Sequence, residues 1–130
     1  KKAIISYENK EITILADRFH FYNIIYNIIE NAVKYANENP EIEISWKENQ
    51  RDYELQFLDN GQGIPEKDLP FIFDKFYRVS REDNKEIEGF GIGLSYVKKI
   101  CQLHHWNVTI ANTSNGLQIT IRIPKKDIYE

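Results

Sequence analysis

The chain has 130 residues, of which 42% are apolar and 13% aromatic, and its 17 basic and 20 acidic side chains give a net charge of −3. This length and composition predict a single packed domain, residues 1–130, rather than a disordered chain. The acidic balance argues against nucleic acid as a partner and against direct contact with an anionic membrane surface, since both favour clustered Lys and Arg.

Cysteine usage and hydropathy indicate the setting of this domain. Cys101 is the single cysteine, so an intrachain disulfide is excluded, as is typical of a reducing compartment such as the cytoplasm. No apolar run approaches the roughly 20 residues of a membrane span, and no signal peptide is recognisable. The chain opens abruptly at KKAII and contains no methionine, so we expect one domain of a longer protein.

The N-terminal part predicts two short strands and a long helix. Alternating residues favour strands at 3–7 and 11–15, and Asp17 then stands where a helix N-cap is expected. The helix should run to about Asn37, before Asn39-Pro40. Its expected core face consists of Tyr22, Ile25, Ile28, Ile29, Ala32 and Ala36. Its expected polar sector consists of His20, Asn23, Asn27, Glu30, Asn31 and Lys34.

The polar sector is unusual because Asn27 and Asn31 lie one turn apart in mid-helix, although Asn is a poor helix former. An amide oxygen is a neutral ligand that suits Mg²⁺, which keeps phosphate oxygens and waters as further ligands. Lys34, one turn on, adds the positive charge that a triphosphate needs. The three residues predict a site for magnesium-bound phosphates, but a solvated helix face rich in Asn explains them equally well on their own.

An alternating hairpin follows at 41–49 and 52–60, and it ends in the glycine-rich turn DNGQGIP. Asp59 should project from the strand end, where a carboxylate can accept the exocyclic amine of adenine and would repel the carbonyl oxygen of guanine. Gly61 and Gly63 would allow close approach to the backbone. Taken alone, DxGxG is more simply a surface turn.

The next stretch, 66–76, suggests one or two short helices, and the aromatic cluster FIFDKFYR overlaps its end at 71–78. Phe73 and Phe76 are expected to lie mostly in the core. Arg78 stands at the edge of a charged segment, 77–88, which we expect to be a mobile loop, and it could stabilise charge on a transferring phosphoryl group.

GFGIGLS opens the second helix with three glycines, Gly89, Gly91 and Gly93, whose N–H groups could face phosphates. It is neither a dinucleotide fingerprint nor a P-loop, and by itself it could be a hinge. The helix SYVKKICQLHH should bury Leu94, Val97, Ile100 and Cys101. Strands at 106–113 and 117–124 close the chain. The sum is an α/β two-layer sandwich: a mixed, largely antiparallel sheet with helices packed on one face.

Taken together and in this order, four motifs resemble the catalytic ATP-binding domain of bacterial sensor histidine kinases, which has the Bergerat fold shared with DNA gyrase, Hsp90 and MutL. NIIENAVKYA is similar to the N box, DNGQGIP to the first glycine box, FDKFYR to the F box and GFGIGLS to the second glycine box. The resemblance covers residues 17–124. The F box and the pattern N-x-x-x-N-A-x-K-Y separate histidine kinases from gyrase-like relatives, which carry a glutamate where Asn27 stands here.

The resemblance implies roles for these residues. Asn31 would bind Mg²⁺, Asn27 would lie near the phosphates of ATP and Lys34 would contact them. Tyr35 would pack on adenine, and Asp59 would hold its amino group. The other residues placed at the nucleotide are Gly61, Gly63, Ile64, Phe76, Tyr77, Arg78, Gly89, Gly91, Gly93 and Leu94. Arg78 would join Asn27 and Lys34 in catalysis.

The implied activity is transfer of the γ-phosphoryl group of Mg-ATP to a histidine on a separate dimerisation domain, with a response regulator downstream. The charged segment 77–88 would be the ATP lid. The isolated domain should be monomeric and belong to the cytoplasmic part of a membrane-anchored sensor kinase. The alternatives are an ATP-sensing pseudo-kinase, an ATPase, or a serine kinase of the anti-sigma type.

Three features depart from the family pattern. The family's HGG is replaced by His104-His105-Trp106, which we expect to be a structural difference only. Gln118 stands where a small hydroxyl residue often helps to bind adenine. No phosphoacceptor motif is present, and His20, His104 and His105 all lack the acceptor context.

Overall fold

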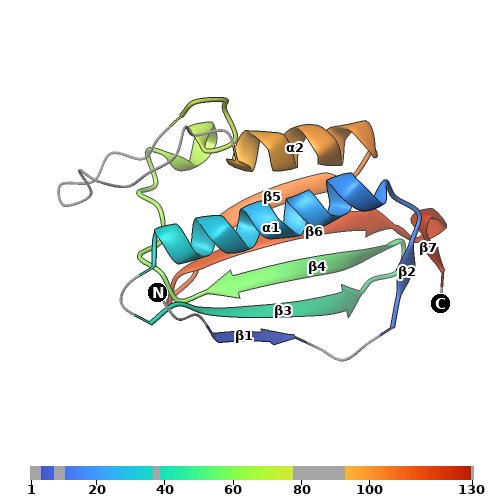
Figure 1. Ribbon diagram of the computed structural model, residues 1–130, viewed down its shortest axis with the longest axis horizontal. Coiled ribbons are helices and arrows are strands. Elements are labelled where there is room, and N and C mark those ends of the chain that lie inside the picture. The colour runs from blue at the N-terminus through green and yellow to red at the C-terminus, as the bar shows by residue number, and fades with distance from the viewer. Residues whose placement is uncertain (1–3, 8–10, 37–38, 78–92, 130) are drawn as a thin grey trace.

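The computed structural model describes residues 4–7, 11–36, 39–77 and 93–129. Two helices cover one face of a five-stranded sheet (Figure 1). Strand β1 is parallel to β3, and the other neighbouring strands of this sheet are antiparallel. The strand order is β1 (Ile4–Tyr7), β3 (Glu41–Glu48), β4 (Asp52–Asp59), β6 (Leu117–Pro124) and β5 (Asn107–Asn112). The predicted two-layer α/β sandwich is therefore confirmed.

Helix α1 (Arg18–Lys34) begins at the predicted N-cap. The Asp17 carboxylate accepts the backbone N–H of His20, the third helical residue, at 2.9 Å. At the other end Ala36 donates its N–H to the Val33 carbonyl at 3.4 Å, a tightened turn that ends the helix earlier than predicted.

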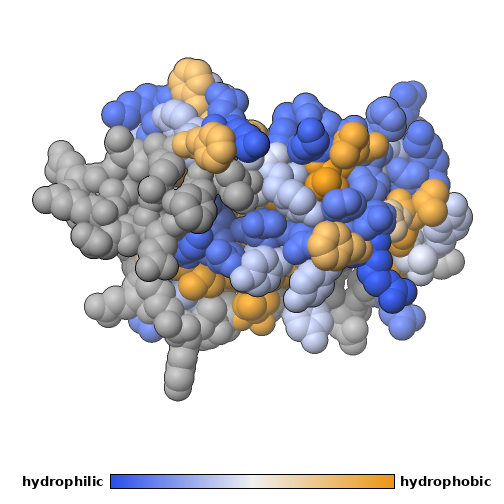
Figure 2. All heavy atoms as spheres, turned by 45° about the horizontal axis from the view of Figure 1, so that its top comes forward, coloured by the Kyte–Doolittle hydropathy of each residue, from blue (hydrophilic) through white to orange (hydrophobic). Residues whose placement is uncertain are grey.

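The core face of α1 differs from the prediction. Ile24, Ile28 and Ala32 are buried, whereas Tyr22 is 64% exposed. The apolar side chains of this helix span more than half of its circumference at about 100° per residue, so periodicity alone did not determine which part of the arc faces the sheet. With the α2 side brought forward, the surface is largely hydrophilic with scattered hydrophobic side chains (Figure 2).

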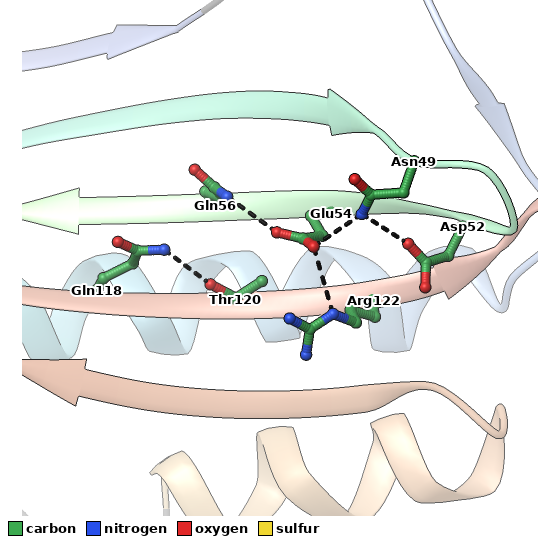
Figure 3. A network of polar contacts seen from close by, with 7 residues as sticks. All are labelled: Asn49, Asp52, Glu54, Gln56, Gln118, Thr120 and Arg122. Atoms are coloured by element: carbon green, nitrogen blue, oxygen red, sulfur yellow. Dashed lines mark hydrogen bonds and ion pairs between the residues drawn. The ribbon is translucent and has the colours of Figure 1, made fainter.

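Side chains alternate across the sheet, as the period of a strand requires. The side under the helices is apolar and almost fully buried, and its centre consists of Tyr53, Leu55, Phe57, Ile119, Ile121 and Ile123. The opposite side carries a polar network centred on Glu54, which accepts hydrogen bonds from Asn49, Gln56 and Arg122 (Figure 3). Burial acts to raise the pKa of Glu54, but the bonds from Asn49 and Gln56 and the charge of Arg122 lower it overall. The two faces therefore have different chemistry.

Helix α2 (Gly93–Leu103) lies beside α1 and starts two residues earlier than predicted. The four residues predicted for its core face are all buried: Leu94, Val97, Ile100 and Cys101. Burial raises the pKa of the Cys101 thiol to about 12, so this cysteine is a packing residue at neutral pH.

The C-terminus of α2 explains the departure at His104-His105-Trp106. Trp106 donates its N–H to the Cys101 carbonyl at 2.8 Å and His105 donates to Gln102 at 3.0 Å, which is the Schellman pattern. His105 has φ +62° in the left-handed position that glycine usually occupies. The neighbouring His104 accepts the Asp17 N–H at 3.3 Å and packs on Trp106. The expectation of a structural difference at this position agrees with these contacts.

A second sheet was not predicted. Strand β2 (Thr13–Ile14) pairs antiparallel with β7 (Ile128–Tyr129), and β2 does not pair with β1. Short 3₁₀ helices occur at η1 (Leu69–Phe71) and η2 (Lys125–Asp127). Among the described residues, none of the helices combines the length and the apolar character that crossing a membrane requires.

Candidate functional site

The asparagines of α1 are oriented by their own helix. Asn27 donates its Nδ2 to the Asn23 carbonyl at 2.7 Å, and Asn23 donates to the Phe19 carbonyl at 2.9 Å. These bonds leave the amide oxygen of Asn27 pointing away from its own helix. A Cβ atom on Gly93 would lie 3.2 Å from this oxygen, so Asn27 stands where α1 meets the start of α2.

Asn31 lies one turn further along and is half-buried. Within the described part of the chain its side chain has no hydrogen-bond partner, so its amide oxygen is available to a ligand. The described residues contain no group of three or more His, Cys, Asp or Glu side chains that could hold a metal ion. A single amide oxygen together with phosphate oxygens and water is nevertheless a donor set that fits Mg²⁺.

Lys34 is paired within the helix. Its ammonium lies 3.1 Å from a carboxylate oxygen of Glu30, and both side chains are about one-third exposed. A hydrogen bond from Tyr26 and the contact with Lys34 lower the pKa of Glu30. Exposed pairs at this spacing contribute only a few tenths of a kcal/mol, so Lys34 can exchange Glu30 for a more strongly charged anion.

Asp59 is the last residue of β4 and lies on the helix side of the sheet. Its register partner in β6 is Leu117. The carboxylate accepts the Gly61 N–H at 2.9 Å and the backbone N–H of Leu117. Burial raises the pKa of Asp59, and the two backbone bonds only partly offset this effect. Asp59 is therefore a fixed, desolvated acceptor.

The turn after Asp59 packs against the end of α1. A Cβ atom on Gly61 would lie 3.3 Å from the Tyr35 carbonyl oxygen, which places the two predicted motifs in contact. On the other side, a Cβ atom on Gly116 would lie 2.1 Å from the Asp59 carbonyl oxygen, so only glycine fits where β6 begins. Ile64, predicted at the nucleotide, has its side chain in the hydrophobic core.

The aromatic segment differs in part from the prediction. Phe73 packs against the core, but Phe76 is 63% exposed, so the expected core position of Phe76 is wrong. Phe76 has φ +68°, a left-handed conformation that turns the chain and directs this side chain outward. Tyr77 donates its hydroxyl to the carboxylate of Asp68, and this bond raises the pKa of Tyr77.

Asp68 was not identified from the sequence. It is only 4% exposed, and its second carboxylate oxygen has no hydrogen-bond partner among the described residues. In the sequence it is one of several charged residues in EKDLP and carries no signal of its burial.

Several predicted site residues lie outside the described part of the chain: Arg78, Gly89, Gly91 and the rest of the charged segment 78–88. Two contacts join the predicted motifs: Gly61 lies against the Tyr35 carbonyl at the end of α1, and Gly93 lies against the Asn27 amide. Gly93 begins α2, and Leu94 is buried beneath it.

The structure places the Gln118 side chain away from Asp59. Its side chain donates to the Thr120 hydroxyl at 3.1 Å on the polar face of the sheet, away from the helices (Figure 3). Leu117, its neighbour, is the residue beside Asp59. Because side chains alternate across a strand, the Gln118 side chain lies on the opposite face of the sheet from Asp59.

Sequence similarity to known proteins covers most of the chain. A family model described as "Histidine kinase-, DNA gyrase B-, and HSP90-like ATPase" matches residues 16–127. The chain is 37% identical over 115 residues to the sensor protein RprX of Bacteroides fragilis, covering 85% of this chain and 22% of RprX. It is 34% identical over 106 residues to the signal transduction histidine-protein kinase ArlS of Staphylococcus haemolyticus, covering 82% of this chain and 23% of ArlS. The chain thus spans less than a quarter of these relatives.

Solved structures share the fold. The mycobacterial sensor histidine kinase MprB superimposes with a TM-score of 0.80 at 20% identity, covering 95% of this chain and 82% of that one. The nucleotide-free catalytic domain of the histidine kinase ThkA gives a TM-score of 0.77 at 26% identity, covering 95% and 79%.

Proposed function

The chain belongs to the family of histidine kinase-, DNA gyrase B- and HSP90-like ATPases, and from this premise we propose that it binds Mg-ATP and donates the γ-phosphoryl group to a histidine of a separate dimerisation domain. The observation that carries the proposal is the contact between the turn after Asp59 and the Tyr35 carbonyl at the end of α1, one turn beyond Asn31, which sets a partly buried carboxylate against the helix that carries the amides. In this proposal the chain is the cytoplasmic catalytic domain of a two-component sensor kinase, with a response regulator downstream.

Asp59 supplies the base end of the site. Its carboxylate is acceptor-only and is held by the N–H groups of Gly61 and Leu117, and since a carboxylate can accept about four hydrogen bonds, capacity remains for the amino group of adenine. A guanine carbonyl oxygen at the same place would face a negative charge. Tyr35, whose carbonyl oxygen lies against this turn at the end of α1, would pack on the purine.

Asn31, Asn27 and Lys34 supply the phosphate end. Asn31 would hold Mg²⁺, which neutralises charge on the β- and γ-phosphates when it is bound. Lys34 leaves Glu30 and binds a phosphate oxygen, and Asn27 lies at the start of α2 beside Gly93. Arg78, together with Gly89 and Gly91, belongs to the same proposal on the strength of the sequence.

The transfer step needs little acid–base chemistry from this chain. A neutral imidazole nitrogen of the acceptor attacks the γ-phosphorus, a P–N bond forms, and the P–O bond to ADP breaks with its electron pair leaving on ADP. The imidazole proton passes to a base on the acceptor domain. The chain's own residues position the phosphates and neutralise their charge, which is the main requirement of phosphoryl transfer.

The test is to mix the chain with the histidine-bearing domain of its own kinase and labelled ATP. We expect acid-labile phosphohistidine on the acceptor from the wild type and none from Asn31→Asp, whose carboxylate would repel the phosphates. Asn107→Asp is the matched control, because Asn107 is exposed on β5. Full transfer by Asn31→Asp would refute the assignment of Asn31. Nucleotide binding without transfer would indicate a pseudo-kinase, and an acid-stable product would indicate a serine kinase.

A further inference from the structure

The side chain of Asn112, which was not identified as functional from the sequence, holds the end of the DNGQGIP turn that is farther from Asp59. Asn112, the last residue of β5, accepts the Ile64 N–H on its Oδ1 at 2.8 Å and donates its Nδ2 to the Ile64 carbonyl at 2.7 Å. One amide therefore satisfies both backbone groups of a residue 48 positions away in the sequence. Such a two-point contact fixes the orientation of the backbone as well as its distance.

Gly63 makes room for this contact. A Cβ atom on Gly63 would lie 2.7 Å from Oδ1 of Asn112, closer than real Cβ contacts occur, and Gly63 has φ +75°. Both the space and the backbone conformation require glycine at this position. Gly63 and Asn112 thus form a complementary pair, and the second glycine of DxGxG is explained by the Asn112 amide.

Asn112 also lies in register with the proposed base-binding carboxylate. Across three neighbouring strands Asn112 pairs with Leu117, and Leu117 pairs with Asp59, so the three residues form one row on the helix side of the sheet. The turn begins at Asp59, which is in this row. At the other end of the turn, Ile64 is held by the side chain of Asn112, which is in the same row. Its first half is held by the Asp59 carboxylate, which accepts the Gly61 N–H at 2.9 Å.

We propose that Asn112 is a positioning residue for the purine pocket: by holding Ile64 it fixes the turn that carries Gly61 and Gly63 against Asp59. This inference rests on the proposed function, since it assigns a role within the same site. Asn112 acts through the backbone of the turn and has no contact with the phosphates. Its loss should therefore weaken binding of the base and leave the phosphate end intact.

The experiment measures binding of two probes by calorimetry: a non-hydrolysable ATP analogue with Mg²⁺, and Mg-tripolyphosphate, which has no base. For Asn112→Ala we expect the affinity for the ATP analogue to fall about tenfold or more and the affinity for tripolyphosphate to change less than twofold. In the phosphotransfer assay the same variant should raise KM for ATP and leave kcat within about twofold. Asn107→Ala, an exposed position of the same strand, is the matched control.

Asn112→Asp provides a second variant in case the alanine variant does not fold. It keeps the shape and the acceptor for the Ile64 N–H but sets a carboxylate oxygen against the Ile64 carbonyl, so a loss of ATP-analogue affinity at least as large as that of Asn112→Ala is expected. Equal loss for both probes, or unchanged ATP-analogue binding by a folded variant, would overturn the role of Asn112. Failure of the wild type to bind the ATP analogue would instead refute the proposed function.

Discussion

The two ends of the proposed nucleotide site are built differently. At the base end, the Asp59 carboxylate is held by the backbone N–H groups of Gly61 and Leu117, in a place where burial raises its pKa. At the other end, the Asn31 amide has no hydrogen-bond partner among the described residues, and Lys34 is paired with the partly exposed Glu30.

The difference has a physical reason. A base is neutral and must be recognised by a rigid acceptor, since a carboxylate free to rotate gains little selectivity. A magnesium-bound triphosphate brings its own charge and ligands, so side chains with free or exchangeable partners can bind it without a large rearrangement. We therefore expect changes at the base end to alter which ligand binds, and changes at the phosphate end to alter how strongly the phosphates are held.

The largest expected effect is at Asp59. Asp59→Asn keeps the size of the side chain but places an amide where an anionic acceptor stood, so ATP affinity should fall about 100-fold, or about 2.7 kcal/mol. The relative affinity for ITP, whose base presents a carbonyl oxygen, should rise. Competitive binding of ATP and ITP measures both changes. Asp52→Asn, at the other end of β4, is the control and should leave both affinities unchanged.

Lys34→Ala should affect the opposite end. Loss of the ammonium should lower ATP affinity about tenfold, or about 1.4 kcal/mol, and leave adenosine affinity unchanged because adenosine has no phosphates. The thermal midpoint should hardly move, since the Glu30 pair is partly exposed. Lys99→Ala, an exposed position on α2, serves as the control. An equal loss for adenosine would mean that Lys34 acts on the base end or on the fold.

The raised pKa of Asp59 predicts opposite pH trends for folding and for binding. Below that pKa the folded state holds a proton more tightly than the unfolded chain, so the contribution of Asp59 to the free energy of unfolding should increase as pH falls and decrease as pH rises. Adenine binding should weaken over the same range, because a protonated carboxyl presents a donor to the amino group. The pH range in question lies between the raised pKa of Asp59 in the folded state and its ordinary value of 3.8. Urea unfolding and adenosine titration across this range, each compared with Asp59→Asn, measure the two trends.

Much of the fold was predictable because the relevant signals are local. The Asp17 cap depends on the four consecutive residues 17–20, and the hairpin of β3 and β4 on strict alternation. Pairing of the two-residue strands β2 and β7 was not predictable, since such short strands have no period and lie at opposite ends of the chain. The left-handed Phe76 and His105 were missed because non-glycine residues seldom adopt this conformation.

In the candidate site, too, the residues placed by local geometry were predictable and those placed by contacts between distant segments were not. Asn27, Asn31 and Lys34 share a face by helical geometry alone, and Asp59 is placed by the end of its strand. The contact of Leu117 with Asp59 depends on register between strands, and the same register puts the Gln118 side chain on the opposite face of the sheet. The role of Asn112 could not be predicted for a different reason. An Asn before a turn is ordinary, and only the fold brings its side chain to Ile64.

The smallest expected effect is at Glu30, and it tests whether the phosphate end is exchangeable. Glu30→Gln removes the carboxylate that holds Lys34 at 3.1 Å and one negative charge near the phosphates. Because an exposed pair at this spacing contributes only a few tenths of a kcal/mol, ATP affinity should rise about twofold at low salt. The gain should shrink as ionic strength increases, since the interaction is screened. Glu43→Gln, exposed on β3, should show no gain. If Glu30→Gln instead weakens ATP binding at low salt, Glu30 positions Lys34 for the phosphates rather than competing with them, and the phosphate end is as fixed as the base end.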